Sequence, residues 1–553
     1  MRWLLLLGSL ALLVPATVHG LEPGDLWRAW PSERFVQTPA PCLRPAELNE
    51  LLGELARRHP ELSIREVGRS VQGRPIHLVA IGAGERRVLM WSQMHGDEPS
   101  ATPALLDLAH YFLLHRDDPD IARALGGLTL LLVPMLNPDG AEVYTRRNAL
   151  AIDVNRDALN LTTPEGQLLE RLRDEYRPIL GFNLHDQNRR RTAGDSGVLA
   201  TIALLAVTGD AANTLTPERQ LAKRACAAIA GALAPHIPGG LARYDQTWSP
   251  RSFGDNITAW GTPVVLLESG GVAPGIPFEE LTRLNFTALG EVLVSFARDG
   301  LAGRDPAVYD ALPENNIDVW SDVVVRGGEI RQPGSTSPYR ADLAFDLLRN
   351  DRELAGCLPG PAGTQPRSEI TELGDARVFG AGREVDGTGR ILLAPFTVAV
   401  HGWAARRWLD ATTVDRLARL GVARLAWVVA PRHVDAAARR AAALGGAGRP
   451  WIEVSSDPEV LPRRVLAELP RPPASSSLAS LVASVEAACR AQSYTDLGAS
   501  LEALWNGASQ PPLRYEAPAS FLLLRRTAGE ADLARSVVDA IWLDGVELQE
   551  SAP

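Results

Sequence analysis

The chain has 553 residues, of which 46% are hydrophobic and 22% are charged. This composition is typical of a folded globular protein, argues against an intrinsically disordered chain, and leaves room for more than one domain. The formal net charge of −10 argues against a nucleic acid as partner, because phosphate backbones bind basic surfaces.

The N-terminus has the pattern of an export signal. Arg2 precedes an apolar run at residues 3–18, and small residues lie near Gly20. This pattern is typical of a secretory signal peptide, so we expect residues 1–20 to be removed. The run is too short to favour a permanent membrane span. Because Lys223 is the one lysine among 56 basic residues, the coding bias indicates a bacterium, and we expect a periplasmic or extracellular protein.

The next segments alternate between helix and strand. Residues 45–59 have the spacing of an amphipathic helix that opens the first folded domain. Residues 87–91 are apolar and strand-like, and residues 104–114 have helical spacing with apolar faces. The sequence His95-Gly96-Asp97-Glu98 lies between that strand and that helix. Active sites of α/β enzymes are found at this kind of sheet edge.

His95 and Glu98 form an H-x-x-E pair. The pair brings an imidazole nitrogen and a carboxylate to one borderline-soft cation, and zinc prefers such ligands. A four-residue pattern also occurs by chance in ordinary turns, so the interpretation depends on further ligands downstream.

Two later strands are predicted to end in side chains of the same kind. Residues 179–186 have the pattern of a short buried strand with His185 at its end, and residues 263–267 form an apolar run that ends in Glu268. A carboxylate in that position needs a partner, because a buried unpaired charge is costly. Three protein ligands with an open position would make a catalytic zinc site, and a carboxylate that is not a ligand could take a proton from a bound water.

Several motifs follow one another in the first half of the chain. They are the lead-in at residues 64–76, the H-x-x-E pair, Asn137-Pro138-Asp139-Gly140 at the end of a strand, the run RRNALAIDVNRD at residues 146–157, and the strand ends at His185 and Glu268. Together these motifs resemble the M14 family of zinc carboxypeptidases over residues 40–300. The resemblance implies a mixed twisted sheet flanked by helices, with one bound Zn²⁺ ion.

The resemblance also implies roles for residues at the metal. His95, Glu98 and His185 would be the zinc ligands. Glu268 would be the general base that activates a zinc-bound water and later protonates the leaving amine. Asp186 follows a ligand, and it could either orient that ligand or simply end the strand.

Further roles follow from the run at residues 146–157. Asn155 and Arg156 match the family's pair that grips the terminal carboxylate of the substrate. Arg146 best matches the arginine that polarises the carbonyl and stabilises the oxyanion, and a shift to Arg147 stays open. Asp153 matches the carboxylate that orients a zinc-bound imidazole, although it could instead cap a turn.

Substrate selection depends on a later loop. Tyr244 is the nearest candidate for the family's mobile tyrosine, and a loop-packing ring is an equally open interpretation. Asp255 lies in a segment without a close counterpart in the digestive enzymes. A loop-capping aspartate is favoured there over one that selects basic terminal residues.

Beyond the peptidase-like region at residues 21–300, the pattern predicts a loop-rich connector at residues 301–316, a β-rich accessory region at residues 317–411, and an α/β region at residues 412–553. We derive no function for these later regions. The four cysteines are widely spaced and predict no disulfide framework: Cys42, Cys226, Cys357 and Cys489.

These observations lead to three hypotheses. The first is an exported zinc metallocarboxypeptidase that cleaves a C-terminal peptide bond with a zinc-activated water, acting on a peptide or peptide-like substrate with a free C-terminal carboxylate. The second is an M14-like amidase or deacylase acting on cell-wall peptides or N-acyl amino acids. The third is an inactive peptide-binding module, which the presence of all the expected ligands and the base disfavours.

Overall fold

The computed structural model describes residues 20–22, 24–37, 43–273, 276–315, 319–331, 339–348, 367–388, 390–393, 397–401, 411, 414, 424–428, 434–446, 451–455, 513–515 and 522–525. The predicted signal peptide, apart from Gly20, and three of the four cysteines lie outside them. Two compact units are present, with residues 1–194 and 198–318 in the main part of the first, and residues 319–354 and 358–553 in the main part of the second.

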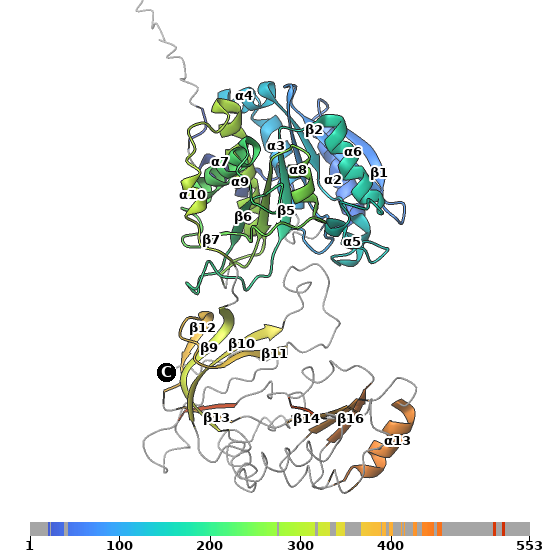
Figure 1. Cartoon of the computed structure of the whole chain (residues 1–553), viewed down its shortest axis with the longest axis vertical. Helices are drawn as coiled ribbons and strands as arrows, with labels where there is room; N and C mark the ends of the chain where they lie inside the picture. Colours follow the sequence, from blue (N-terminus) through green and yellow to red (C-terminus); the bar gives the residue numbers. More distant parts are fainter. Residues whose placement is uncertain are drawn as a thin grey trace, which may run out of the picture. The chain divides into compact units, whose positions relative to one another are not determined.

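The first unit is built on an eight-stranded sheet of order β1-β2-β4-β3-β5-β8-β6-β7. Figure 1 shows β1 and β2 on one side of this unit, β5 in the middle, and β6 and β7 on the other side. The central strands β4, β3, β5 and β8 are parallel, whereas β2 and β6 pair with them in the antiparallel direction, so the sheet is mixed, as predicted. The strands are β1 (Ser63–Arg69), β2 (Pro75–Ile81), β3 (Arg86–Trp91), β4 (Leu128–Val133), β5 (Leu180–Asp186), β6 (Ile202–Ala206), β7 (Leu241–Arg243) and β8 (Val264–Ser269).

Helices cover both faces of this sheet. They are α1 (Asp25–Glu33), α2 (Pro45–Arg58), α3 (Ala101–Leu114), α4 (Pro119–Gly127), α5 (Pro138–Val143), the short 3₁₀ helix η1 (Val154–Arg156), α6 (Pro164–Tyr176), α7 (Pro217–Leu233), α8 (Phe253–Ala259), α9 (Glu279–Asp299) and α10 (Ala307–Asp310). Helices α6 and α7 each begin after a threonine whose hydroxyl accepts a backbone N–H of the first turn, with proline next in sequence.

Strand alternation explains why both faces are covered. In β3, Val88 and Met90 enter the core shared with α3 and α9, whereas Leu89 and Trp91 enter the core shared with α6 and α8. Successive side chains of a strand point to opposite faces, so a strand that is apolar throughout needs a layer on each side. The first unit is therefore a three-layer α/β structure.

Parallel order brings the functional motifs to one edge. β3, β5 and β8 are neighbours that run in the same direction, so the turn after β3 and the last residues of β5 and β8 lie at the same edge of the sheet. His95, His185 and Glu268 occupy these places. The sheet topology, rather than sequence proximity, therefore assembles the candidate site.

The second unit contains two sheets. The first is β11-β10-β9-β13-β18, with β12 paired to β9, and the second is β16-β15-β14-β17. Helix α13 packs against β16. The elements are β9 (Trp320–Arg331), β10 (Tyr339–Leu348), β11 (Arg367–Gly374), β12 (Gly380–Asp386), β13 (Arg390–Leu393), β14 (Thr397–His401), β15 (Arg424–Val428), α13 (Val434–Leu444), β16 (Trp451–Ser455), β17 (Leu513–Tyr515) and β18 (Leu522–Arg525).

The structure differs from the sequence-based expectations in three places. Asn137 does not end a strand: β4 ends at Val133, and the Asn137 side chain caps α5 by accepting the N–H of Gly140. Helix α10 lies within the segment predicted as a loop-rich connector. β14 precedes the predicted division at residue 412 yet pairs with β15 beyond it. Among the described helices, none is long and apolar enough to cross a membrane.

Candidate metal centre and active site

The turn after β3 holds His95 and Glu98 in a fixed conformation. Gln93 has a positive φ of 46°, and its side-chain Nε2 donates to the carbonyl of Gly96 at 3.1 Å. A Cβ on Gly96 would lie 2.0 Å from the carbonyl carbon of Gly140, so glycine is required there. The close approach packs this turn against the start of α5.

His95, Glu98 and His185 meet at the carboxyl edge of the sheet. Nδ1 of His95 lies 2.7 Å from Oε1 of Glu98, and Nδ1 of His185 lies 2.5 Å from Oε2 of the same carboxylate. The two Nδ1 atoms are 3.1 Å apart. All three side chains are buried, and one ligand atom from each lies within 4.8 Å of the others.

The donor atoms of this cluster suit a zinc ion. Asp153 Oδ1 lies 3.0 Å from Nε2 of His95, and accepting a hydrogen bond from it would leave the lone pair of this imidazole on Nδ1. Ligand atoms about 2.0–2.1 Å from a tetrahedral zinc ion lie about 3.3 Å from one another. The separations of 2.5 to 3.1 Å in the cluster are close to this value. One carboxylate and two imidazoles also match the ligand types of catalytic zinc sites.

Charges around the cluster attract a cation. Although burial favours the neutral imidazole, the Glu98 carboxylate and the hydrogen bond to Asp153 raise the pKa of His95 to about 9. Burial by itself would raise the pKa of Glu98, but the two imidazoles lower it. The carboxylates therefore draw positive charge to the point where the ligand atoms meet.

Glu268 lies beside His185, because the two residues are register partners on the parallel strands β5 and β8. Its side chain is buried, with 7% exposure. Burial and then the charge of Glu98 raise the pKa of Glu268 well above its ordinary value. The charge of Glu268, followed by burial, in turn raises the pKa of the Tyr244 phenol. Tyr244 is therefore within electrostatic reach of Glu268.

Arg146, and not Arg147, points to the cluster of His95, Glu98 and His185. Nη1 of Arg146 lies 3.1 Å from Nδ1 of His95 and 3.1 Å from Oε1 of Glu98. Its Nε donates to Oδ2 of Asp153 at 3.0 Å. The guanidinium of Arg147 instead donates to the carbonyl of Ala151 in the same loop.

Asp153 makes contacts that suit both of the interpretations that its sequence allowed. Oδ1 lies at hydrogen-bond distance from His95, and it also accepts the backbone N–H of Asn155 at 2.9 Å, which caps η1. The cap fixes the start of the segment that carries Asn155 and Arg156. One carboxylate thus connects the orientation of an imidazole to the position of the next two side chains.

Asn155 and Arg156 contact the start of α8. Oδ1 of Asn155 accepts the N–H of Phe253 at 2.9 Å, and Nη1 of Arg156 donates to Oγ of Ser252 at 3.0 Å. Asp255 accepts the N–H of Ser249 at 2.9 Å, which agrees with its loop-capping interpretation. Arg156 is exposed, so its guanidinium remains accessible to a ligand.

Ser100 was not singled out from the sequence. Its hydroxyl and backbone N–H donate to Oδ2 of Asp186 at 2.9 and 3.2 Å, and the N–H of Asp186 donates to Glu98 at 3.3 Å. These bonds connect the turn after β3 to the end of β5. A serine immediately before an apolar helix was the available signal, but that position alone indicates only a helix cap.

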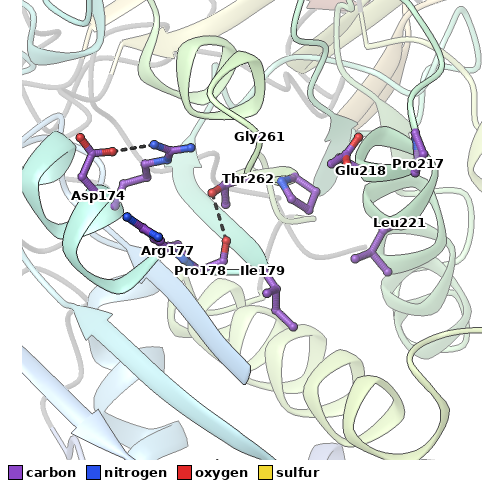
Figure 2. Close-up of a pocket in the computed structure, with 11 residues that line it drawn as sticks. Asp174, Arg177, Pro178, Ile179, Pro217, Glu218, Leu221, Gly261 and Thr262 are labelled. Carbon is purple, nitrogen blue, oxygen red and sulfur yellow. Dashed lines mark hydrogen bonds and ion pairs between the residues drawn. The ribbon is translucent and has the colours of Figure 1, made fainter. Parts of the chain in front are cut away.

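A separate pocket of about 740 Å³ lies at the opposite end of β5 and β8, near Pro178 and Pro263. Figure 2 shows Arg177 and Glu218 on opposite sides of it, with Thr262 between them. His185 and Glu268 lie near the other ends of the same strands. The pocket is therefore not part of the candidate metal centre.

Part of the first unit is similar to zinc carboxypeptidases. Residues 48–177 match the family model described as zinc carboxypeptidase. The match contains the H-x-x-E pair and the run at residues 146–157, and it ends before His185. A solved metallo-carboxypeptidase from Burkholderia cenocepacia is similar over 46% of this chain and 70% of that chain, with 20% identity and a TM-score of 0.38.

Two curated relatives show the range of proteins that this chain resembles. Carboxypeptidase E of Caenorhabditis elegans is 30% identical over 134 residues, which is 20% of this chain and 28% of that protein. Gamma-D-glutamyl-L-diamino acid endopeptidase 1 of Lysinibacillus sphaericus is 33% identical over 96 residues, which is 16% of this chain and 24% of that protein. The chain thus spans about a quarter of the length of each relative. Within the first unit, the similarity to the zinc carboxypeptidase family covers residues 48–177.

Proposed function

We propose that the protein is an exported zinc metallocarboxypeptidase that hydrolyses the last peptide bond of a substrate with a free C-terminal carboxylate. The observation that carries this proposal is the meeting of His95, Glu98 and His185, with Glu268 beside His185. Structural zinc sites have four protein ligands, whereas three ligands leave a position for chemistry. Export rests on the signal-like residues 1–20.

The residues of the cluster divide into ligands and a base. Zinc held by His95, Glu98 and His185 would supply a Lewis acid that polarises a carbonyl and lowers the pKa of a water molecule. Glu268 would take a proton from the attacking water and later donate it to the leaving amine nitrogen.

Cationic side chains would orient and stabilise the substrate. Arg146 carries a fixed positive charge next to the cluster and would stabilise the oxyanion that develops on the scissile carbonyl. Arg156 is exposed, and its planar guanidinium suits the terminal carboxylate. Asn155 lies next to it, and Tyr244 lies within electrostatic reach of Glu268, where it would contact the substrate.

An amidase acting on cell-wall peptides is the second candidate. The 33% identity to an endopeptidase that is named for γ-D-glutamyl and diamino-acid residues favours it. Murein tripeptides and N-acyl amino acids, tested beside a library of ordinary peptides, distinguish the two activities. Preferential hydrolysis of the murein peptides would replace the carboxypeptidase proposal, whereas release of single C-terminal residues from ordinary peptides would support it.

The substitution Glu268→Gln tests the proposed function. The amide keeps the shape of the side chain but cannot act as a base, so hydrolysis should fall by at least about 100-fold. Zinc content, measured by elemental analysis, should stay at the wild-type value because Glu268 is not a ligand. Glu175→Gln, at an exposed position of α6, is the control. A Glu268→Gln variant with wild-type turnover in a mass-spectrometric peptide assay would refute the proposal.

A further inference from the structure

The loop between α5 and η1 determines where the Arg146 guanidinium lies. Arg146 is near the start of this loop and Asp153 is at its end, and the two side chains form an ion pair of 3.0 Å. Both also contact His95. Ala151, near the end of the loop, has a positive φ of 59°. A residue other than glycine seldom adopts this backbone conformation unless surrounding contacts hold it.

Asn148 supplies those contacts from inside the loop. Its Oδ1 accepts the backbone N–H groups of Leu150 and Ile152 at 3.0 and 3.1 Å. Its backbone N–H donates to the carbonyl of Ile152, and its carbonyl accepts the N–H of Ala151. The side chain is 5% exposed. One buried amide therefore organises the turn that follows Arg146.

Glu165, in the first turn of α6, fixes the orientation of this amide. Backbone N–H groups can only donate, so the atom of Asn148 that faces Leu150 and Ile152 is the oxygen, and the amide nitrogen faces the other way. That nitrogen donates to Oε2 of Glu165 at 3.1 Å. The other oxygen of Glu165 accepts the N–H of Val71 at 3.3 Å. Glu165 is fully buried, so the loop is anchored to the body of the first unit.

We propose that Asn148, oriented by the buried carboxylate of Glu165, is a positioning residue that places the Arg146 guanidinium against the developing oxyanion. This inference rests on the proposed function, since it names what holds the oxyanion arginine in place. Asn148 is two residues from Arg146 and does not contact the metal cluster through any described bond. Its effect on hydrolysis must therefore pass through the loop, and a displacement of about 1 Å can lower a rate by about 100-fold.

An exchange of the two buried groups tests the contact directly. Asn148→Asp keeps an oxygen for the loop N–H groups but places a second carboxylate against Glu165, so kcat should fall by about 10-fold or more. The double variant Asn148→Asp/Glu165→Gln restores one amide and one carboxylate with their positions exchanged. In it, the amide at position 165 can donate to position 148 while its oxygen still accepts the N–H of Val71. The double variant should recover kcat to within about threefold of wild type. A folded, zinc-loaded double variant as impaired as Asn148→Asp would overturn the proposal.

A double-mutant cycle asks whether the effect passes through Arg146. Asn148→Ala should lower kcat by about 10-fold or more while KM changes by less than about threefold. In an Arg146→Ala background the same substitution should change kcat by less than about twofold, because the group that it positions is already missing. Leu150→Ala, an exposed position of the same loop, is the matched control and should retain wild-type kinetics. Equal losses of kcat in both backgrounds would show that Asn148 acts by another route.

Hydrogen exchange provides a readout that does not depend on activity. Asn148→Ala should lose protection at the amides of Leu150 and Ile152 while protection of β5 is retained, and unchanged protection of both amides would overturn the proposal. Failure of this inference would leave Glu268→Gln inactive and Asn148→Ala active. Failure of the proposed function would instead appear as a Glu268→Gln variant with wild-type turnover. The two failures are therefore distinguishable.

Discussion

Arg156 is exposed although its guanidinium already makes two hydrogen bonds within the protein. Nη1 donates to the carbonyl of Asn155 at 2.7 Å and to Oγ of Ser252 at 3.0 Å. Both acceptors are neutral, so the positive charge is not neutralised by them. A substrate carboxylate would add a charge-assisted hydrogen bond, and such bonds are stronger than those to neutral oxygens.

We therefore expect Arg156→Ala to weaken the binding of substrates with a free C-terminal carboxylate by about 10- to 100-fold, since a hydrogen bond to a charged group contributes about 1.5–3 kcal/mol. Amidated versions of the same peptides lack the charge and should change much less. Inhibition constants of matched acid and amide peptides measure the difference. Arg147→Ala, which removes a guanidinium bound within its own loop, is the control. Equal losses for acid and amide peptides would place the carboxylate elsewhere.

Adjacent residues mark the limit of what the sequence can predict at this scale. Arg146 and Arg147 have the same side chain and lie in one loop, and no periodicity applies to a loop, so the sequence left both open. Their orientations depend on Asp153 and on the carbonyl of Ala151. The contact between Asn148 and Glu165 was not predicted either. It joins a loop to a helix, and a carboxylate in a first helical turn already has a sufficient local explanation.

At the scale of elements, a histidine pair joins α2 to α3. Nε2 of His59, just after α2, lies 2.8 Å from Nδ1 of His110 on α3, and both side chains are buried. Burial lowers the pKa of His110 to about 4 and also lowers the pKa of His59. If both rings were protonated, two N–H groups would face each other and the hydrogen bond would be lost.

These shifts predict that acid weakens the first unit. A base whose pKa is lower in the folded state binds fewer protons there than in the unfolded state. Its contribution to the free energy of unfolding is therefore complete above the unfolded-state pKa of about 6.5 and decreases as the pH falls toward 4. We expect His110 to contribute a loss of about 1 kcal/mol in the free energy of unfolding between pH 7.5 and 5.5. Urea titrations at the two pH values measure the total loss.

His110→Gln should reduce this pH dependence, because glutamine does not titrate. Leu114→Gln, at an exposed position of the same helix with no titratable group, should leave the difference between the two pH values unchanged. The comparison uses the change with pH and not the absolute stability, so packing losses in either variant cancel. A wild-type pH dependence in His110→Gln would show that the histidine pair does not couple protonation to folding.

Elements were predicted well wherever one strand is buried on both faces. The strands at residues 86–91 and 264–269 contain apolar runs, and the strand at residues 180–186 is apolar up to His185 except for Asn183, so the polar residues at or just after the strand ends are conspicuous in the sequence. Their order in the sheet was not predictable, because β4 inserts between β2 and β3 and β8 pairs with β5 across a long stretch of chain. The strand expected to end at Asn137 ends earlier, at Val133, because an asparagine followed by proline suits a helix start equally well.

At the scale of the whole molecule, the candidate site lies within the first compact unit. His95, Glu98, His185 and Glu268 all belong to it, whereas β15, β16 and α13 belong to the second. The candidate ligands His95 and Glu98 lie in the turn after β3, and His185, near the end of β5, follows Glu98 by 87 residues. An ion bound by all three would therefore cross-link that turn to the end of β5. A ligand that binds only the folded state stabilises it in proportion to the logarithm of its concentration over its Kd.

We therefore expect chelation of zinc to loosen one unit of the full chain and not the other. At a free concentration of about 100 Kd, bound zinc contributes about 2.7 kcal/mol, so EDTA should lower the protection of amides in β5 and β8 by up to about 100-fold. Amides of β15 and β16 should exchange at the same rate with and without EDTA, as measured by mass spectrometry of peptic fragments. His185→Ala removes a ligand and should make the first unit insensitive to EDTA. A wild-type chain whose β5 protection does not respond to EDTA, or a His185→Ala chain that still responds, would contradict a zinc ion at this cluster.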